Sequence, residues 1–195
     1  MSDQGLESKW AYSLTPEEEA ICAQVGFDRQ KPYLGQPWMN RNYSEGDTWE
    51  IWQHIVAAGS ELAFARMVGM SDFVPHVNKW KTEEDVPGYE IRYCFTKKNS
   101  DYPKWSMRYH ERDDDNHVYV LLVEGLEIKT RRSSTNGYAS HPYRALGWMW
   151  GYECRKPQYE SPFMSKYQNW SVPHYDLHDM NLLGKDSEKT SPAIA

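Results

Sequence analysis

The chain contains little cysteine and no long apolar run. Its three cysteines, Cys22, Cys94 and Cys154, are far apart among the 195 residues and form no C-x-x-C pair. An odd number at this spacing argues against a disulfide framework or a thiolate zinc site, so we interpret them as reduced core residues of a cytosolic protein. No apolar run approaches the ~20 residues of a membrane span. The first residues lack the basic start and apolar stretch of a secretory signal, so none is expected.

The sequence also lacks several well-known catalytic motifs. It contains no glycine-rich phosphate loop, no G-x-S-x-G and no H-E-x-x-H. The net charge of −6 argues against a general nucleic-acid coat protein, which usually has a basic balance. It does not argue against a nuclease, because a magnesium site concentrates acid and the bound metal reverses the sign of that patch.

The length suits one domain with a sizeable core, which we place at residues 1–183, with a disordered tail over 184–195. A first helix is expected from the Thr-Pro-Glu-Glu sequence at residues 15–18, which combines a cap, a helix-start proline and a capping box. Gly26 can end this helix. A second helix is expected, with Asp47 as its cap and Gly69 after its last turn. Gly59 in its middle costs about 1 kcal/mol relative to alanine, so we expect a packing reason, such as a close approach to a sheet.

Beyond residue 88 the pattern changes to strands separated by clusters of Asn, Asp, Gly and Ser. We expect strands at Tyr89–Thr96, Trp105–His110, Val118–Val123, Leu126–Thr130 and Ala145–Glu153. The third of these is continuously apolar, which is typical of a central strand buried on both faces. Residues 133–142 are expected to form a surface loop, and Trp170–Leu177 a short closing strand and turn.

One carboxylate of the second predicted helix lies among very small residues. Glu61 is part of Gly-Ser-Glu-Leu-Ala-Phe-Ala-Arg at residues 59–66, with alanines one turn away on either side. A buried acid in such surroundings is costly unless something pairs with it. A metal ion, or a water that a metal holds, would satisfy it. Alternatively, Glu61 reaches solvent at the edge of the face, or pairs with Arg66 or His54.

A tight turn and a strand supply two more acids and a cation. In Asp-Val-Pro-Gly-Tyr-Glu-Ile-Arg, residues 85–92, Glu90 and Arg92 share one face of the predicted strand. Asp85, before the turn, can fold back toward that face. Two carboxylates about one ion apart can hold Mg²⁺, which polarises a phosphate and activates water while a cation stabilises the developing charge. The alternative is an acidic turn followed by a cross-strand ion pair.

The order of these residues resembles that of the PD-(D/E)XK nuclease superfamily, in which a helix carries Glu, an Asp follows, and Glu-x-Lys lies on a strand. The chain is more closely similar to a group of uncharacterised bacteriophage proteins of that type. The resemblance covers most of the chain and includes residues 15–18, 59–63, 85–92, 107–115, 118–121, 147–151 and 172–173. It implies an α/β (α+β) core, in which a mixed, mostly antiparallel sheet is flanked by helices, with an N-terminal helical elaboration and a metal site at the open edge of the sheet.

The resemblance also assigns roles to residues. Glu61 would match the helix acid, Asp85 the motif Asp and Glu90 the second metal acid, so these three would bind Mg²⁺ or Mn²⁺. Arg92 stands where the superfamily usually has a catalytic lysine; arginine keeps the charge but cannot give up a proton. The implied function is a Mg²⁺-dependent DNA endonuclease or nickase in the host cytoplasm. The alternatives are a catalytically degenerate member that binds DNA or a host protein, and a structural virion protein.

Contacts to nucleic acid are expected at two places. The first is a tryptophan between two lysines: Lys79, Trp80 and Lys81. The second is Arg108, which alternates in phase with Ser106 and His110 on a predicted strand next to the proposed site. A cation on such a strand can contact phosphate.

Two further clusters each allow two interpretations. Residues 110–117, His-Glu-Arg-Asp-Asp-Asp-Asn-His, can bind a transition metal. Because Asp and Asn also form good turns, we favour a hydrated hairpin turn. Trp148, Trp150 and Tyr152 alternate on one predicted strand face and can stack on bases. For these three we favour core packing.

Overall fold

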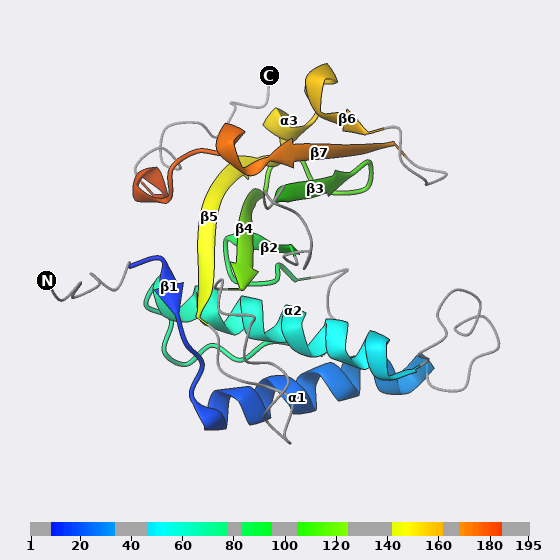
Figure 1. Ribbon diagram of the computed structural model, residues 1–195, viewed down its shortest axis with the longest axis vertical. Coiled ribbons are helices and arrows are strands. Elements are labelled where there is room, and N and C mark those ends of the chain that lie inside the picture. Colours follow the sequence, from blue (N-terminus) through cyan, green and yellow to red (C-terminus); the bar gives the residue numbers. More distant parts are fainter. Residues whose placement is uncertain are drawn as a thin grey trace, which may run out of the picture. The chain divides into compact units, whose positions relative to one another are not determined.

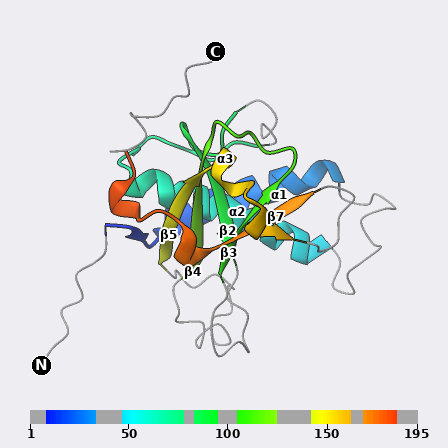
Figure 2. The same cartoon turned by 90° about the horizontal axis from the view of Figure 1, so that it is seen from above.

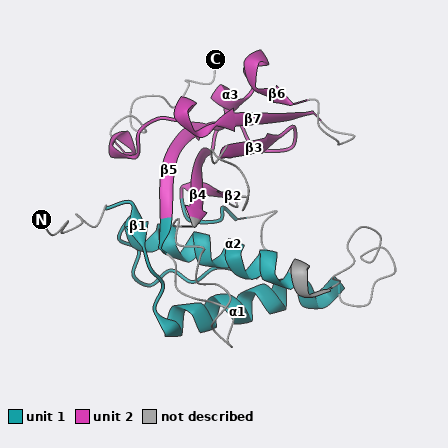
Figure 3. Cartoon of the chain, viewed as in Figure 1, with its two compact units in different colours: residues 1–87, 125–143 teal, residues 88–124, 144–195 magenta. Residues whose placement is uncertain are grey.

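A computed structural model of the protein describes residues 9–33, 47–77, 83–94, 105–124, 142–161 and 168–184; its elements are labelled in Figures 1 and 2. The chain divides into two compact units, shown in teal and magenta in Figure 3. Unit 1 is residues 1–87 with 125–143, and unit 2 is residues 88–124 with 144–195. The described residues form three α-helices and two sheets, which confirms the predicted mixed α and β class. No helix among them is long and apolar enough to cross a membrane.

Unit 1 contains a short strand, two helices and a 3-10 turn: β1 (Ala11–Tyr12), α1 (Pro16–Gln30), η1 (Lys31–Tyr33) and α2 (Asp47–Met67). The predicted capping box of α1 is confirmed. The backbone N–H of Glu18 donates to Thr15 Oγ1 at 3.2 Å, and the N–H of Thr15 donates to Glu18 Oε2 at 3.1 Å. Gly69 follows α2 with a φ of 86°, a left-handed conformation that glycine adopts readily at helix ends.

Two glycines of unit 1 allow close approaches. The prediction that α1 ends at Gly26 is wrong, since the helix continues to Gln30. A Cβ added at Gly26 would lie 2.5 Å from Cγ1 of Ile55 on α2, so this glycine lets the two helices pack closely. A Cβ added at Gly59 would lie 2.3 Å from the hydroxyl oxygen of Tyr143, the first residue of strand β5 (Tyr143–Trp150). The expected packing reason for Gly59 is therefore confirmed.

Unit 2 contains strands of both sheets and several short helical turns. Their bounds are β2 (Tyr89–Cys94), β3 (Ser106–His110), β4 (Val118–Glu124), α3 (Gly151–Cys154), η4 (Pro157–Tyr159), β6 (Glu160–Ser161), β7 (Asn169–Pro173), η5 (His174–Asp176) and η6 (Met180–Leu182). In the first sheet β5, β4 and β2 are neighbours in that order, and the second sheet has the order β3-β7-β6. Side chains from both sheets and from α3 form one core: Met107, Tyr109, Tyr119, Leu121, Met149, Cys154, Tyr159, Trp170 and Val172.

One pair of strands in the first sheet is parallel, as the expected mixed sheet allows. Strands β2 and β4 pair in parallel, with Tyr89 opposite Val118 and Cys94 opposite Val123. Parallel neighbours need a crossover of a dozen or more residues; here the chain between them includes β3, which belongs to the second sheet. Strand β4 confirms the prediction of a central buried strand, because residues 118–123 are each at most 4% exposed. The β3–β7 and β6–β7 pairs are antiparallel.

The strand predicted at Ala145–Glu153 begins two residues earlier and ends sooner. Strand β5 stops at Trp150, and the chain then makes the helical turn α3. Trp148 is buried in the core, as favoured, but Tyr152 lies on α3 and is 45% exposed, with its ring stacked on that of Trp150. The expected alternation of the three aromatics on one strand face is therefore wrong.

The closing strand and turn predicted at Trp170–Leu177 are confirmed by β7 and η5. The strand predicted at Leu126–Thr130, the loop at 133–142 except for its last residue, and the tail from residue 185 lie outside the described residues. The single domain at residues 1–183 stays a prediction.

All three cysteines are free, and two of them are buried, Cys22 in unit 1 and Cys154 in unit 2. Burial raises the pKa of both thiols to about 12. Both thiols are therefore protonated and unreactive near neutral pH. The interpretation as core residues is confirmed for these two, whereas Cys94 is only partly buried.

Candidate functional site

Glu61, the predicted metal ligand on α2, forms a buried ion pair with Arg29 of α1. Arg29 Nη1 donates to Glu61 Oε1 at 2.8 Å, and Arg29 Nη2 donates to Glu61 Oε2 at 2.7 Å. Glu61 is 4% exposed and Arg29 is 7% exposed. Two parallel hydrogen bonds between ionised groups are among the strongest polar contacts in proteins. Glu61 is thus paired inside unit 1, with a residue that was not among its expected partners.

The same guanidinium also holds the segment that follows α2. Arg29 Nε and Nη2 both donate to the backbone carbonyl of His76, at 2.9 and 2.7 Å. Arg29 therefore connects three parts of unit 1 through one rigid, planar group. A sequence signal for this role exists, because Arg29 continues the stripe of Cys22 and Val25 at helical spacing on α1. A cation at a stripe position indicates a buried acidic partner elsewhere in the fold.

The alternative partner Arg66 is engaged with a different carboxylate. Arg66 Nε donates to Glu18 Oε1 at 2.7 Å, and Arg66 Nη1 donates to the carbonyl of Met70 at 2.6 Å. The hydroxyl of Tyr12 also donates to Glu18, at 3.2 Å. This second ion pair is partly buried and joins the start of α1 to the end of α2. The pairing of Glu61 with Arg66 that the sequence allowed is not the one observed.

Burial and neighbouring charges act in opposite directions on Glu61. Burial raises the pKa of Glu61 to about 7, although the hydrogen bonds and the charge of Arg29 act to lower it. The charge of Asp85 adds to the rise. Asp85 also acts to raise the pKa of His76, which burial and Arg29 lower overall. Two of the three predicted metal carboxylates, Glu61 and Asp85, are therefore close enough in unit 1 to influence each other.

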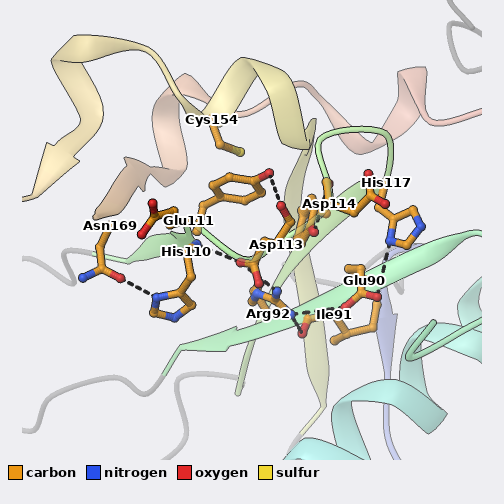
Figure 4. A network of polar contacts seen from close by, with 12 residues as sticks. Glu90, Ile91, Arg92, His110, Glu111, Asp113, Asp114, His117, Cys154 and Asn169 are labelled. Carbon is orange, nitrogen blue, oxygen red and sulfur yellow. Dashed lines mark hydrogen bonds and ion pairs between the residues drawn. The ribbon is translucent and has the colours of Figure 1, made fainter. Parts of the chain in front are cut away.

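In unit 2, strand β2 carries Glu90 and Arg92 toward one polar network, as the alternating pattern predicted (Figure 4). Arg92 Nη1 lies 3.4 Å from Glu90 Oε2, and Arg92 Nη2 lies 3.0 Å from Asp113 Oδ2. The guanidinium carbon lies 4.9 Å from the ring centroid of Tyr119, a cation–π geometry. Arg92 is thus held between two carboxylates and above an aromatic ring.

The second oxygen of Glu90 faces a histidine. Glu90 Oε1 lies 3.6 Å from Nδ1 of His117, the residue immediately before β4, and the two are joined by a dashed line in Figure 4. The contact is an ion pair when His117 is protonated. Glu90 therefore contacts Arg92 with one oxygen and His117 with the other.

The predicted hairpin turn at residues 110–117 is wrong, because β3 and β4 belong to different sheets. In the segment between these strands, two acidic side chains accept hydrogen bonds from nearby backbone N–H groups. Asp113 Oδ2 accepts from the backbone N–H of His110 at 2.8 Å, and Asp114 Oδ1 accepts from the backbone N–H of Asn116 at 2.8 Å. Asp and Asn act here in local turns, as their side chains often do. These two acids are engaged within the loop, and Asp113 also pairs with Arg92 of β2.

The third loop acid is fixed by an arginine that follows α3. Asp115 Oδ1 accepts from Arg155 Nε and from the Tyr109 hydroxyl, each at 2.5 Å. The guanidinium of Arg155 lies 5.2 Å from the ring centroid of Tyr109 and 5.0 Å from that of Trp170. Arg155 Nη2 also donates to the carbonyl of Glu111 at 3.1 Å. This arrangement anchors the loop to the second sheet and was not foreseen from the sequence.

Arg108 lies on the same side of β3 as Ser106 and His110, as the alternating pattern predicted. In β3 the side chains of Met107 and Tyr109 are buried and those of Arg108 and His110 are exposed. Arg108 is opposite Ser171 of β7. The other predicted nucleic-acid contacts, Lys79, Trp80 and Lys81, lie outside the described residues.

The fit of a divalent metal to Glu61 is poor. Both of its oxygens accept from Arg29, so a cation bound there would lie beside a buried guanidinium. Over the described ranges, no group of three or more His, Cys, Asp or Glu side chains is gathered so as to hold a metal ion. Comparisons with protein-family models, with curated proteins and with solved structures found no match. The resemblance to the PD-(D/E)XK superfamily therefore stays a prediction.

Proposed function

We propose that this protein is a nuclease-like protein of PD-(D/E)XK architecture that binds DNA without cleaving it. The observation that carries this proposal is the buried, bidentate ion pair between Glu61 and Arg29. In a metal-dependent nuclease of this type, Glu61 would have to bind the metal ion. In the structure both of its oxygens accept hydrogen bonds from the guanidinium of Arg29. That guanidinium is buried, so water cannot replace Glu61 as its partner.

Metal binding at Glu61 would leave Arg29 without its partner. Removing one partner from a buried ion pair typically costs about 3–5 kcal/mol, because the other charge is left uncompensated. A metal that captured Glu61 would impose much of that cost on Arg29 and would also bring two cations together. Glu61 therefore serves the folded structure of unit 1 rather than the chemistry of a phosphodiester.

Arg92 supports the same proposal from unit 2. It replaces the lysine of the superfamily, and an arginine is effectively always protonated, so it cannot accept a proton from water. Its charge is already compensated by Glu90 and Asp113 at 3.4 and 3.0 Å. Because two carboxylates already neutralise its charge, Arg92 contributes little to stabilising a pentacoordinate phosphorus transition state.

DNA is the favoured partner because β3 exposes a cation that pairs with no acid among the described residues. Arg108 is exposed on β3 and makes no ion pair with any part of the chain that the structure describes. The net charge of −6 means that attraction to DNA has to be local. Such binding depends on salt, because released counterions supply much of its free energy.

The test combines binding and cleavage on one substrate. The full chain is incubated with plasmid and duplex oligonucleotide in Mg²⁺ or Mn²⁺, and one half of each sample is deproteinised before electrophoresis. We expect a mobility shift in the native half and intact DNA in the other. Asp85→Ala should bind as well as the wild type. Metal-dependent nicks that disappear in Asp85→Ala would contradict the proposal.

A second candidate is the metal-dependent nuclease itself. The observation that favours it is the proximity of two acids in unit 1, since the charge of Asp85 acts to raise the pKa of Glu61. Closely spaced carboxylates are common where a cation binds. This candidate predicts that Mn²⁺ stabilises the protein, by about 2.7 kcal/mol at a hundredfold excess over Kd. Thermal unfolding with and without Mn²⁺ separates the two candidates.

A further inference from the structure

We propose that the solvent face of the second sheet in unit 2 is the surface that contacts the sugar–phosphate backbone of DNA. This proposal rests on the proposed function, since it assumes that DNA is the partner. The surface, called the outer face, consists of Ser106, Arg108, His110, Ser161, Asn169, Ser171 and Pro173.

The register of the strands defines this face. Met107 and Tyr109 of β3 lie opposite Val172 and Trp170 of β7, and all four are buried in the core of unit 2. Because side chains alternate along a strand, the intervening residues lie on the other side of the sheet. That side pairs Arg108 with Ser171 and His110 with Asn169. Apart from Glu160 at the edge strand, one face of the sheet is therefore apolar, and the other is polar except for Pro173.

The charge of the outer face favours an anionic partner. Its only permanently charged residue is Arg108, which makes no ion pair within the described ranges. The only carboxylate on the three strands is Glu160, which is opposite Trp170 and so belongs to the other face. In a chain with a net charge of −6, a sheet face that carries cation and no acid is complementary to phosphate.

The remaining side chains are the donors that phosphates accept. Serine hydroxyls, asparagine amides and arginine guanidinium groups make most of the contacts that proteins direct to phosphate oxygens. His110 Nδ1 is hydrogen-bonded to Asn169 Oδ1, so the imidazole is fixed across the two strands. Alternate residues of a strand are about 6.7 Å apart, which is comparable with the spacing of successive phosphates along a nucleic-acid strand. The face carries no Phe, Tyr or Trp ring to stack on bases, so we expect contacts to the backbone and little sequence preference.

The test measures how DNA affinity depends on salt. Fluorescence anisotropy with a labelled duplex gives the slope of log K against log salt for the wild type, Arg108→Ser and Arg108→Lys. Loss of one phosphate contact reduces the magnitude of this slope by about 0.9. If the contact contributes no affinity at 1 M salt, this change in slope corresponds to a loss of DNA affinity of about eightfold at 0.1 M salt. Arg108→Lys keeps the charge and should retain the wild-type slope.

Lys31→Ser is the matched control, because Lys31 is an exposed cation of unit 1 that lies outside the second sheet. It changes the net charge by the same amount and should leave the slope as in the wild type. Thermal unfolding of each variant checks that the fold is kept. Wild-type slope and affinity in Arg108→Ser would overturn this proposal while leaving DNA binding intact. Absence of DNA binding by the wild type would instead overturn the proposed function.

Discussion

The buried ion pair of unit 1 leads to a prediction about stability. We consider Arg29→Met, Glu61→Leu and the double variant, each of which replaces a polar side chain with an apolar one of similar size. Glu61→Leu leaves the buried guanidinium of Arg29 without its partner, and Arg29→Met leaves a buried carboxyl group without its partner, since both residues are less than 10% exposed. We expect each single variant to lose about 3–5 kcal/mol of unfolding free energy.

The double variant should be more stable than either single variant. With both charges gone, the main loss is the donor to the His76 carbonyl, which now accepts two hydrogen bonds from Arg29. Leaving a buried acceptor unsatisfied costs about 1–3 kcal/mol. The double-mutant cycle therefore predicts a coupling energy between Arg29 and Glu61 of several kcal/mol, larger than is usual for exposed pairs.

The cost of Arg29→Met should also depend on pH. Burial raises the pKa of Glu61 to about 7, so its ionisation opposes folding, and stability falls as pH rises from the unfolded pKa through the folded pKa. Without Arg29 the folded pKa of Glu61 rises further, so the variant loses stability more steeply over this range. We therefore expect Arg29→Met to be more costly at pH 8 than at pH 6.

Urea unfolding, followed by circular dichroism at the two pH values, measures these differences. Single variants that each cost less than about 1 kcal/mol, and whose effects add in the double variant, would refute the reasoning. Such a result would mean that Glu61 and Arg29 do not form the tight pair, and the carboxylate would again be available to a metal.

Three further predictions follow from the packing and the charges. Gly59→Ala should cost about 1–3 kcal/mol, because its Cβ would lie 2.3 Å from the Tyr143 hydroxyl, and adding Tyr143→Phe should recover part of this loss in thermal unfolding. Cys22 and Cys154, whose pKa values burial raises to about 12, should resist alkylation at pH 8 until the protein is denatured, and mass spectrometry would show early modification if this is wrong. Burial acts to raise the pKa of Asp115, but hydrogen bonds from a tyrosine and an arginine lower it overall, so its stabilising contribution is lost as pH falls through the folded pKa. The unfolding free energy of Asp115→Asn should therefore fall less at acid pH than that of the wild type. The same decrease in both proteins would count against the assigned contacts of Asp115.

The sequence predicted the elements whose signals are local. The capping box at Thr15 and the left-handed glycine after α2 each involve neighbouring residues, and both are found. The apolar run of β4 also marks a strand that is buried on both sides. Packing at Gly59 was predictable because a glycine in mid-helix is costly unless a neighbour comes close.

The pairings between distant residues were not predictable in the same way. Arg29 and Glu61 are 32 residues apart, and the stripe position of Arg29 indicates a buried acidic partner without indicating which acid it is. The parallel pairing of β2 with β4 depends on the excursion of β3 into the second sheet, which the alternation within each strand does not encode. For the same reason residues 110–117 looked like a hairpin turn.

The candidate site was predicted in its residues more than in its contacts. The shared orientation of Glu90 and Arg92 followed from strand alternation, and so did the exposure of Arg108. The roles of Asp113 and His117 as neighbours of these two residues depend on the loop before β4, whose path is set by tertiary contacts. Sequence patterns identify candidate charges, but only the fold determines which charge each one meets.

We infer that the carboxylates of this protein pair with its own cations and do not hold a catalytic metal. Isothermal titration of Mn²⁺ into the wild type and into Glu90→Ala tests this claim most directly. The account predicts no saturable binding to either protein, with circular dichroism confirming that both are folded. Stoichiometric binding to the wild type that disappears in Glu90→Ala would contradict the claim and place a metal on the carboxylates that the nuclease motif predicts.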